Sequence, residues 1–150
     1  MDYHPMAMTD EDRDDLLGTG GTGVLSVARG AAEPPYTVPI SYGYDAEGGQ
    51  FYFRLAFGTD SGKHDVVTDG AQATFVTYRE TSEGWQSVVA TGQLEAIDED
   101  HPDTATLDAM RHIDIPLFDV FEEETRTLEF HFFRLVPGTL TGRRENPIRE

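Results

Sequence analysis

The pattern of hydrophobic and polar positions along the chain predicts a mainly β protein. Short stretches rich in aromatic and β-branched residues are separated by clusters of Gly, Pro, Asp and Glu. This spacing is typical of strands joined by turns. Most connections have the length of a hairpin, so we expect a six-stranded antiparallel barrel with peripheral helices. The predicted strands are 24–28, 36–44, 50–57, 72–78, 85–97 and 128–136.

Two segments carry helical patterns of different strength near the ends of this strand series. Thr9 precedes Asp10, Glu11 and Asp12, an arrangement of capping hydroxyl and first-turn acids that predicts a helix over about 9–17. The segment 103–112 shows a rough apolar stripe and is also predicted to be helical. Two further predictions are a short helix over 64–69 and a loop with one helical turn over 113–124.

The glycine cluster Gly18-Thr-Gly-Gly-Thr-Gly23 resembles a dinucleotide-binding loop only in composition. It follows a helix and precedes a strand, whereas the dinucleotide fingerprint requires the reverse order. We therefore interpret it as a helix stop and a flexible joint.

Three positions predict irregularities in the strands. Pro39 lacks a backbone donor in the middle of its strand, which implies a sheet edge or a bulge. Gly92 is expected to kink the long fifth strand. Pro137 and Gly138 are expected to close the last strand, so that the barrel covers about 23–137 and the tail from Arg143 is loose.

Composition restricts the class of protein. A chain of 150 residues with 38% hydrophobic residues is expected to form a single domain over 1–150. No apolar run approaches the roughly 20 residues of a membrane span. The absence of cysteine excludes disulfides and thiolate sites, and the five histidines lack metal-binding spacing. We expect a cytoplasmic protein without a metal site.

Charge is the strongest compositional signal. The chain carries 28 acidic and 11 basic residues, a formal net charge of −17. Self-repulsion at this charge favours a salt-rich environment, as in halophiles, although an ordinary acidic protein is the alternative. Nucleic acid, whose phosphates would be repelled, is not an expected partner.

The segment 51–63 carries a candidate anion site. Its aromatic strand breaks at Gly58 into small and polar residues, and backbone N–H groups in such a turn can bind an anion. Arg54 can supply a bidentate fork, and Lys63, the only lysine, a point charge. These residues suggest a bound phosphate; a plain connector is the alternative, because the spacing fits neither known phosphate fingerprint.

Taken together, the segments resemble the FMN-binding split-barrel family related to pyridoxamine 5'-phosphate oxidase, and particularly its nitroimidazole-resistance-like branch. The resemblance covers about residues 15–137 in the family's order. The matching stretches are Gly23-Val-Leu-Ser-Val27, Pro35-Tyr-Thr-Val-Pro-Ile-Ser-Tyr-Gly-Tyr-Asp45, Phe51-Tyr-Phe53 leading to Ser61-Gly-Lys63, Trp85-Gln-Ser-Val-Val-Ala-Thr-Gly92 and Phe133-Arg-Leu-Val-Pro137.

The resemblance implies a homodimer with FMN at the subunit interface. It places Val38, Pro39, Ile40 and Ser41 along the isoalloxazine ring, and it brings Ser87 toward the flavin from either subunit. It further implies that the phosphate is held by Arg54, Ser61 and Lys63, with Leu55 beside the ribityl chain. Trp85 is a candidate to approach the flavin from the same strand as Ser87, and packing within the sheet is the alternative role for its side chain.

The implied function is a flavin-dependent oxidoreductase acting on a small molecule, with an electron donor such as NAD(P)H and no assignable acid–base catalyst. The final strand lacks the basic Arg–His motif of the oxidase proper, running from Phe130-His-Phe132 to Arg134-Leu-Val136. Asp60 also stands where a basic residue is common. The alternatives are a non-catalytic FMN or haem carrier or sensor, and a deazaflavin-dependent reductase.

Overall fold

The computed structural model describes residues 6–30, 32–57, 67–82, 84–97, 104, 107 and 129–145. Within these ranges the chain forms one α-helix and seven strands, all but one of the strands being at least eight residues long. The elements are β1 (Met6–Ala7), α1 (Asp10–Leu17), β2 (Gly20–Val27), β3 (Tyr36–Asp45), β4 (Gln50–Phe57), β5 (Gln72–Thr81), β6 (Gly84–Ala96) and β7 (Glu129–Glu145).

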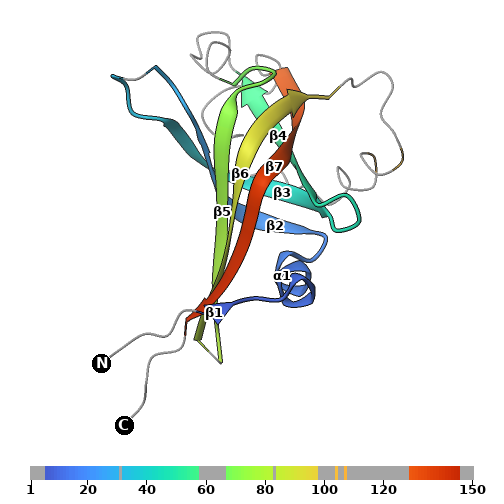
Figure 1. The fold of residues 1–150 in the computed structure, drawn as a ribbon. Helices are drawn as coiled ribbons and strands as arrows, with labels where there is room; N and C mark the ends of the chain where they lie inside the picture. The colour runs from blue at the N-terminus through green and yellow to red at the C-terminus, as the bar shows by residue number, and fades with distance from the viewer. Residues whose placement is uncertain are drawn as a thin grey trace.

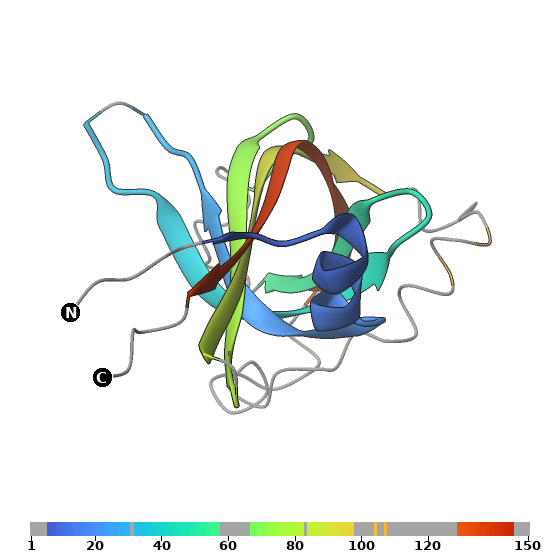
Figure 2. The same cartoon turned by 60° about the horizontal axis from the view of Figure 1, so that its bottom comes forward.

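The strands form an antiparallel barrel. Their order is β1-β7-β4-β3-β2-β5-β6, and an additional pairing of β6 with β7 closes the sheet on itself (Figures 1 and 2). The six strands β2 to β7 make up the barrel, and the two-residue β1 is added beside the end of β7. The predicted six-stranded antiparallel barrel is thereby confirmed.

The barrel interior is filled by aromatic and aliphatic side chains, as expected for a closed sheet of this size. Phe75 is completely buried, and its ring centroid lies 5.0 to 5.3 Å from those of Tyr42, Phe51 and Phe53 in edge or tilted contacts. Gly23 leaves room for the Phe75 ring, because a Cβ there would lie 2.5 Å from it.

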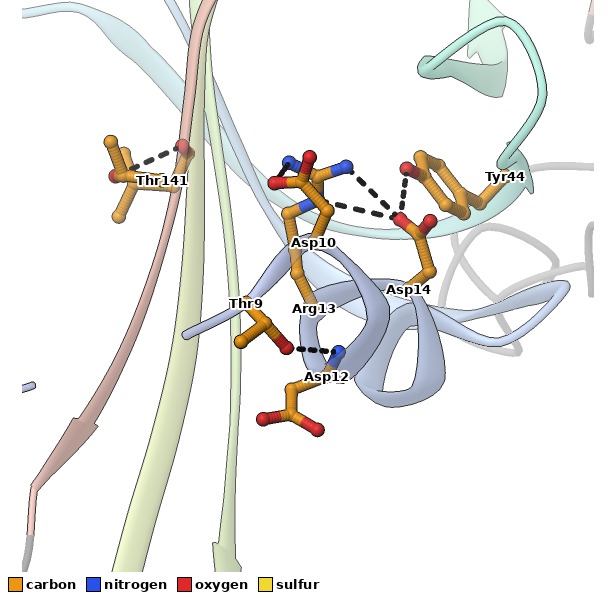
Figure 3. A network of polar contacts seen from close by, with 8 residues as sticks. Thr9, Asp10, Asp12, Arg13, Asp14, Tyr44 and Thr141 are labelled. Atoms are coloured by element: carbon orange, nitrogen blue, oxygen red, sulfur yellow. Dashed lines mark hydrogen bonds and ion pairs between the residues drawn. The ribbon is translucent and has the colours of Figure 1, made fainter. Parts of the chain in front are cut away.

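Helix α1 packs against the barrel through its last turn. Thr9 caps the helix by accepting a hydrogen bond of 3.1 Å from the Asp12 N–H, which confirms the predicted start. Leu17 is buried in the core, and the Tyr42 hydroxyl donates to its carbonyl oxygen at 2.9 Å. Figure 3 shows the helix, its capping contact and the hydrogen bond from Tyr44 of β3 to Asp14.

Three strands extend by three or more residues beyond their predicted bounds, β2 at its start and β5 and β7 at their ends. Gly20 to Gly23 belong to β2, paired with Gly43 to Ile40, so the glycine cluster is not only a flexible joint. Strand β7 continues past Pro137 and Gly138 to Glu145, so the tail that was predicted to be loose from Arg143 is part of the sheet up to Glu145, and 146–150 lie outside the described residues.

The continuation of β7 depends on a bulge. The register with β6 shifts between Thr91 and Gly92: Thr91 pairs with Thr139 and Gly92 with Pro137, so Gly138 is the extra residue. A bulge tolerates the missing N–H of proline, which explains why the strand does not end there. The predicted irregularity at Gly92 is confirmed.

Other predictions fall largely outside the described residues. In the predicted helix over 64–69, the described end at 67–69 forms a bend and a turn. In the predicted helix over 103–112, Thr104 and Leu107 are helical and the rest lies outside the described residues, as does 113–124. Among the helices that the structure describes, none is long and apolar enough to cross a membrane.

Candidate functional site

The barrel has a split between β3 and β4. Their ladder runs from Asp45–Gln50 to Tyr42–Phe53 and ends there. Beyond that point the two strands part: residues 36–41 of β3 continue in register with β2, whereas residues 54–57 of β4 continue with β7. Ser41 and Arg54 are therefore the first residues past the last pair, one on each side of the split.

Backbone groups of β3 are directed toward the split. The Tyr44 N–H donates to the Thr19 carbonyl on the β2 side. Because hydrogen-bonding direction alternates along an antiparallel strand, Thr37, Pro39 and Ser41 present their backbone groups to the opposite side, where the β4 ladder has ended. The missing N–H of Pro39 thus removes no ladder bond, and its predicted position at a local edge is confirmed.

Side chains at the split divide between the two faces of the sheet. Ile40 and Leu55 are each 3% exposed and belong to the core, and Val38 packs against it. The side chains of these three residues are therefore not available to a ligand outside the barrel. Pro39 is exposed on the outer face, and Ser41, on the same face, is 2% exposed.

Arg54 brings a positive charge to the outer side of the split. It lies between the core residues Phe53 and Leu55, so its side chain leaves the barrel on the outer face, and it is in register with Phe132 of β7. Its Nη2 atom is buried. Extending the register of the β3–β4 ladder by one step places Arg54 opposite Ser41.

This donor set fits the group that the sequence resemblance implies. A flavin mononucleotide has a planar ring with polar edges and a phosphate. The split provides backbone groups along β3 for the ring edges and a guanidinium for a phosphate. Ser61 and Lys63, the other predicted phosphate ligands, lie outside the described residues, as does Asp60.

Ser87 lies apart from the split. It pairs with Tyr78 of β5 and Arg143 of β7, on strand β6. In the barrel, β6 is three strands from β3 in either direction. With neighbouring strands about 4.8 Å apart, Ser87 is therefore roughly 14 Å from Ser41 along the sheet.

Sequence reasoning missed Thr22 as a neighbour of the site. It is exposed on β2 and pairs with Ser41, so both side chains share the outer face. The interpretation of the glycine cluster as a joint hid this position. The signal was the alternation Gly21, Thr22, Gly23, which places a hydroxyl between two residues without side chains.

A second polar cluster joins α1 to the barrel (Figure 3). The Tyr44 hydroxyl donates to Asp14 Oδ1 at 2.7 Å, and burial with this hydrogen bond raises the pKa of Tyr44 to about 12. Arg13 contacts Asp10 and Asp14 at 3.1 and 3.2 Å. Burial opposes the charge of Arg13, but Tyr44 and the two carboxylates outweigh it and raise its pKa.

The pKa of Tyr42 is raised as well, chiefly by burial. The pKa shifts of Tyr44, Tyr42 and Arg13 all lead away from neutrality, so none of these three groups serves as an acid or base near pH 7. The part of the chain that the structure describes contains no group of three or more His, Cys, Asp or Glu arranged to bind a metal ion.

Comparison with protein families matches residues 9–144 to the family described as pyridoxamine 5'-phosphate oxidase. A comparison with curated protein sequences found no match.

Solved structures share the fold. A FAD-binding protein from Mesorhizobium loti has a TM-score of 0.67 at 18% sequence identity, over 97% of this chain and 100% of that chain. The FAD binding protein from Mycobacterium smegmatis has a TM-score of 0.66 at 15% identity, over 96% and 100%. The FAD and heme binding protein from Mycobacterium smegmatis has a TM-score of 0.63 at 19% identity, over 97% and 75%. At these identities the likeness shows a common fold.

Proposed function

The chain belongs to the pyridoxamine 5'-phosphate oxidase family, and from this membership we propose that it is an FMN-dependent oxidoreductase acting on a small organic molecule. The observation that carries the proposal is the split, where Ser41 and Arg54 lie at the two positions that the sequence resemblance assigns to the flavin ring and its phosphate. FMN, when bound, would supply the exchange of a hydride or of electrons.

The chain's own residues bind and orient the cofactor. Arg54 forms charge-assisted hydrogen bonds with the phosphate, together with Ser61 and Lys63. Along the ring, the backbone N–H of Ser41 donates to a polar edge, which favours added negative charge on the flavin. Val38, Ile40 and Leu55 keep their side chains in the core and contribute a rigid backbone.

The site is completed in a homodimer. Ser87 lies three strands from Ser41 in the barrel, so one subunit does not bring both to the same flavin ring. A second subunit that presents β6 to the split would do so. This arrangement accounts for a hydroxyl predicted at the flavin from a strand remote from the split.

We do not propose that this chain acts on the substrate of pyridoxamine 5'-phosphate oxidase itself. The basic Arg–His motif is missing from the last strand, where His131 is instead in register with Leu55, a core residue. We therefore assign the chain another small organic substrate, reduced or oxidised with an electron donor such as NAD(P)H.

Purification in molar salt, followed by a visible spectrum and chromatography of the released cofactor, tests the proposal. Flavin absorption with released FMN is the expected result. All three of the compared solved structures are described as binding FAD, so released FAD would keep the flavin site and correct the cofactor. A colourless protein that binds no added flavin would refute the proposal.

A second candidate is a non-catalytic carrier or sensor of FMN or haem. The observation that favours it is the fold shared with a protein described as binding FAD and heme. A Soret band in the purified protein would support haem. Repeated turnover with NAD(P)H distinguishes an enzyme from a carrier, and turnover only with reduced deazaflavin would identify the third alternative, a deazaflavin-dependent reductase.

A further inference from the structure

The first half of β2 has a strand partner on one side only. All eight residues of β2 pair with β3, but the ladder between β2 and β5 holds only four pairs and ends at Val24–Val76. Strand β5 continues beyond that point in register with β6. Residues 20–23 are therefore held in the sheet by β3 alone, next to the point where β3 itself parts from β4.

A side chain of β5 replaces the missing ladder bond. The Ala28 N–H donates to the Gln72 carbonyl, so every second residue of β2, down to Thr22, directs its backbone groups toward β5. If the ladder continued, Tyr78 would lie opposite Thr22 and its N–H would donate to the Thr22 carbonyl. Instead the hydroxyl of Thr77, which is 8% exposed, donates to that carbonyl at 2.7 Å. This hydrogen bond ties Thr22 to β5 beyond the end of the ladder.

Thr22 and Ser41 form a pair of hydroxyl side chains on the outer face. They are in register, and Ser26 and Thr37 are an equivalent pair further along the same two strands. The hydroxyls of Ser26 and Thr37 are hydrogen-bonded to each other at 3.0 Å. Among the hydrogen bonds between residues that the structure describes, none involves the hydroxyl of Thr22 or of Ser41. Both hydroxyls therefore keep their hydrogen-bonding capacity for a ligand at the split.

Thr22 is the accessible member of this pair. Its neighbour Gly21 lies against the core, where a Cβ would be 3.3 Å from the Tyr42 ring. Because side chains alternate along a strand, Thr22 points outward, and it is exposed there. Ser41 is only 2% exposed. A ligand on the outer face therefore reaches the Thr22 hydroxyl more readily than that of Ser41.

We propose that Thr22 contacts the flavin and that Thr77 is the residue that positions it. The inference rests on the proposed flavin site and adds two residues that the sequence resemblance does not assign to it. A planar ring that follows β3 to Ser41 comes within reach of Thr22, because opposed side chains have Cβ atoms about 5 Å apart. The Thr22 hydroxyl donates to a polar edge of the ring. This donor favours negative charge on the flavin, as does the N–H of Ser41.

Thr22→Val removes the hydroxyl and keeps the shape of the side chain. We expect the affinity for FMN, from isothermal titration of flavin-free protein in high salt, to fall about twofold to tenfold, the range of one neutral hydrogen bond. The midpoint potential of bound FMN should become more negative, because the reduced flavin loses a donor. Thr22→Ser should restore both quantities. Wild-type affinity and potential in Thr22→Val would overturn the proposal.

A double-mutant cycle tests the positioning role of Thr77. Thr77→Val should change the affinity for FMN and its potential in the same direction as Thr22→Val, and Thr77→Ser should keep the wild-type values. In protein that already carries Thr22→Val, Thr77→Val should have little further effect on either quantity, because Thr77 acts through Thr22. Equal effects of Thr77→Val in both backgrounds would overturn the positioning role.

Thr74→Val is the matched control, because the Thr74 hydroxyl lies 3.2 Å from that of Thr91 on the next strand. It should leave the affinity for FMN and its potential unchanged, and a loss equal to that of Thr22→Val would overturn the proposal. Circular dichroism checks that each variant is folded, and Thr22→Val with Thr22→Ser decides the matter if Thr77→Val does not fold. Wild-type protein that binds no FMN would refute the proposed function together with this inference. Wild-type protein that binds FMN no better than Thr22→Val, at the same potential, would refute this inference alone.

Discussion

Ser41 and Arg54 flank the point where β3 and β4 separate. The last pair of the β3–β4 ladder is Tyr42–Phe53. Ser41 is next to Tyr42 in β3, and Arg54 is next to Phe53 in β4. Ser41 is buried, although it points away from the core, and the Nη2 atom of Arg54 is buried as well. Burying a polar group costs free energy unless a partner in the protein or in a ligand compensates for the lost water, and so both residues are targets for mutation.

Arg54→Gln should weaken FMN binding by about tenfold to a hundredfold, because a hydrogen bond to a charged group contributes roughly 1.5 to 3 kcal/mol. Isothermal titration of flavin-free protein in high salt measures the effect. Combined with Lys63→Ala, the loss should be larger.

Arg29→Gln is the control for Arg54→Gln. Arg29 is exposed beyond the end of β2, with Glu33 as its partner at 3.8 Å. The Arg29→Gln variant should bind FMN with the affinity of the wild type. An unchanged affinity in Arg54→Gln itself, with the variant folded, would remove Arg54 from the site.

The strands were predictable because most of their residues obey a period of two with strong β propensity. The ends of the strands were not predictable, because a partner residue far away in the sequence decides whether an end residue joins the sheet. Gly20 is poor in β propensity, yet it is in β2 because Gly43 lies opposite it. Similarly, β7 passes through Pro137 because β6 supplies a partner and Gly92 admits the bulge.

The site was predictable only in part. The sequence placed Pro39 and Ser41 on one strand and Arg54 on the next, and a hairpin brings such strands together. The division of side chains between core and surface followed from alternation, but the end of the ladder did not. No local signal indicates that pairing stops after Phe53.

Gly92→Ala should destabilise the fold severely. A Cβ at Gly92 would collide with the Val136 carbonyl oxygen and would lie 2.9 Å from the Gly138 nitrogen, and these backbone atoms cannot move without disrupting the bulge. We expect the free energy of unfolding to fall by about 2 to 4 kcal/mol, the range of severe core substitutions. Urea denaturation measures it.

Gly138→Ala is the matched control within the same bulge. Its nearest contact would be the Thr91 carbonyl oxygen at 3.7 Å, which is an ordinary van der Waals distance. The expected change is within about 1 kcal/mol. Equal losses in the two variants would mean that close backbone approach is not the reason for glycine at position 92.

Tyr44 should make stability depend on alkaline pH. Its pKa is raised to about 12 in the folded protein and is about 10 in an unfolded chain. Between these values the unfolded state loses the phenol proton while the folded state keeps it, so folding is disfavoured as pH rises. The contribution, about 2 to 3 kcal/mol, is complete below pH 10 and lost as pH rises through about 12.

Between about pH 10 and about pH 12, Tyr44→Phe should lose less folding stability than the wild type. The stability difference between wild type and Tyr44→Phe, from urea unfolding at pH 8 and at several values from 10 to 12, should narrow as pH rises. Tyr78→Phe, which alters an exposed ring, should follow the wild type. A difference that stays constant with pH would show that the hydrogen bond to Asp14 does not hold the phenol proton.

Salt should stabilise this chain. The net charge of −17 makes the acidic groups of the folded chain repel one another. In 0.1 M salt this repulsion is screened only between charges more than about 10 Å apart, whereas in 1 M salt it is screened beyond about 3 Å. The same salt weakens ion pairs such as Arg144–Asp12, but exposed pairs contribute about 1 kcal/mol or less each. Screening of repulsion should dominate, and Tm should rise by several degrees between 0.1 and 2 M KCl.

Neutralising exposed carboxylates separates charge screening from a general effect of salt on apolar burial. Asp15, Glu47 and Glu80 are exposed. Asp15→Asn, Glu47→Gln and Glu80→Gln combined should raise Tm at 0.1 M KCl and flatten its rise with salt, because less repulsion remains to be screened. An unchanged slope would assign the salt effect to apolar burial, and a Tm that falls with KCl would contradict the expected adaptation to a salt-rich environment.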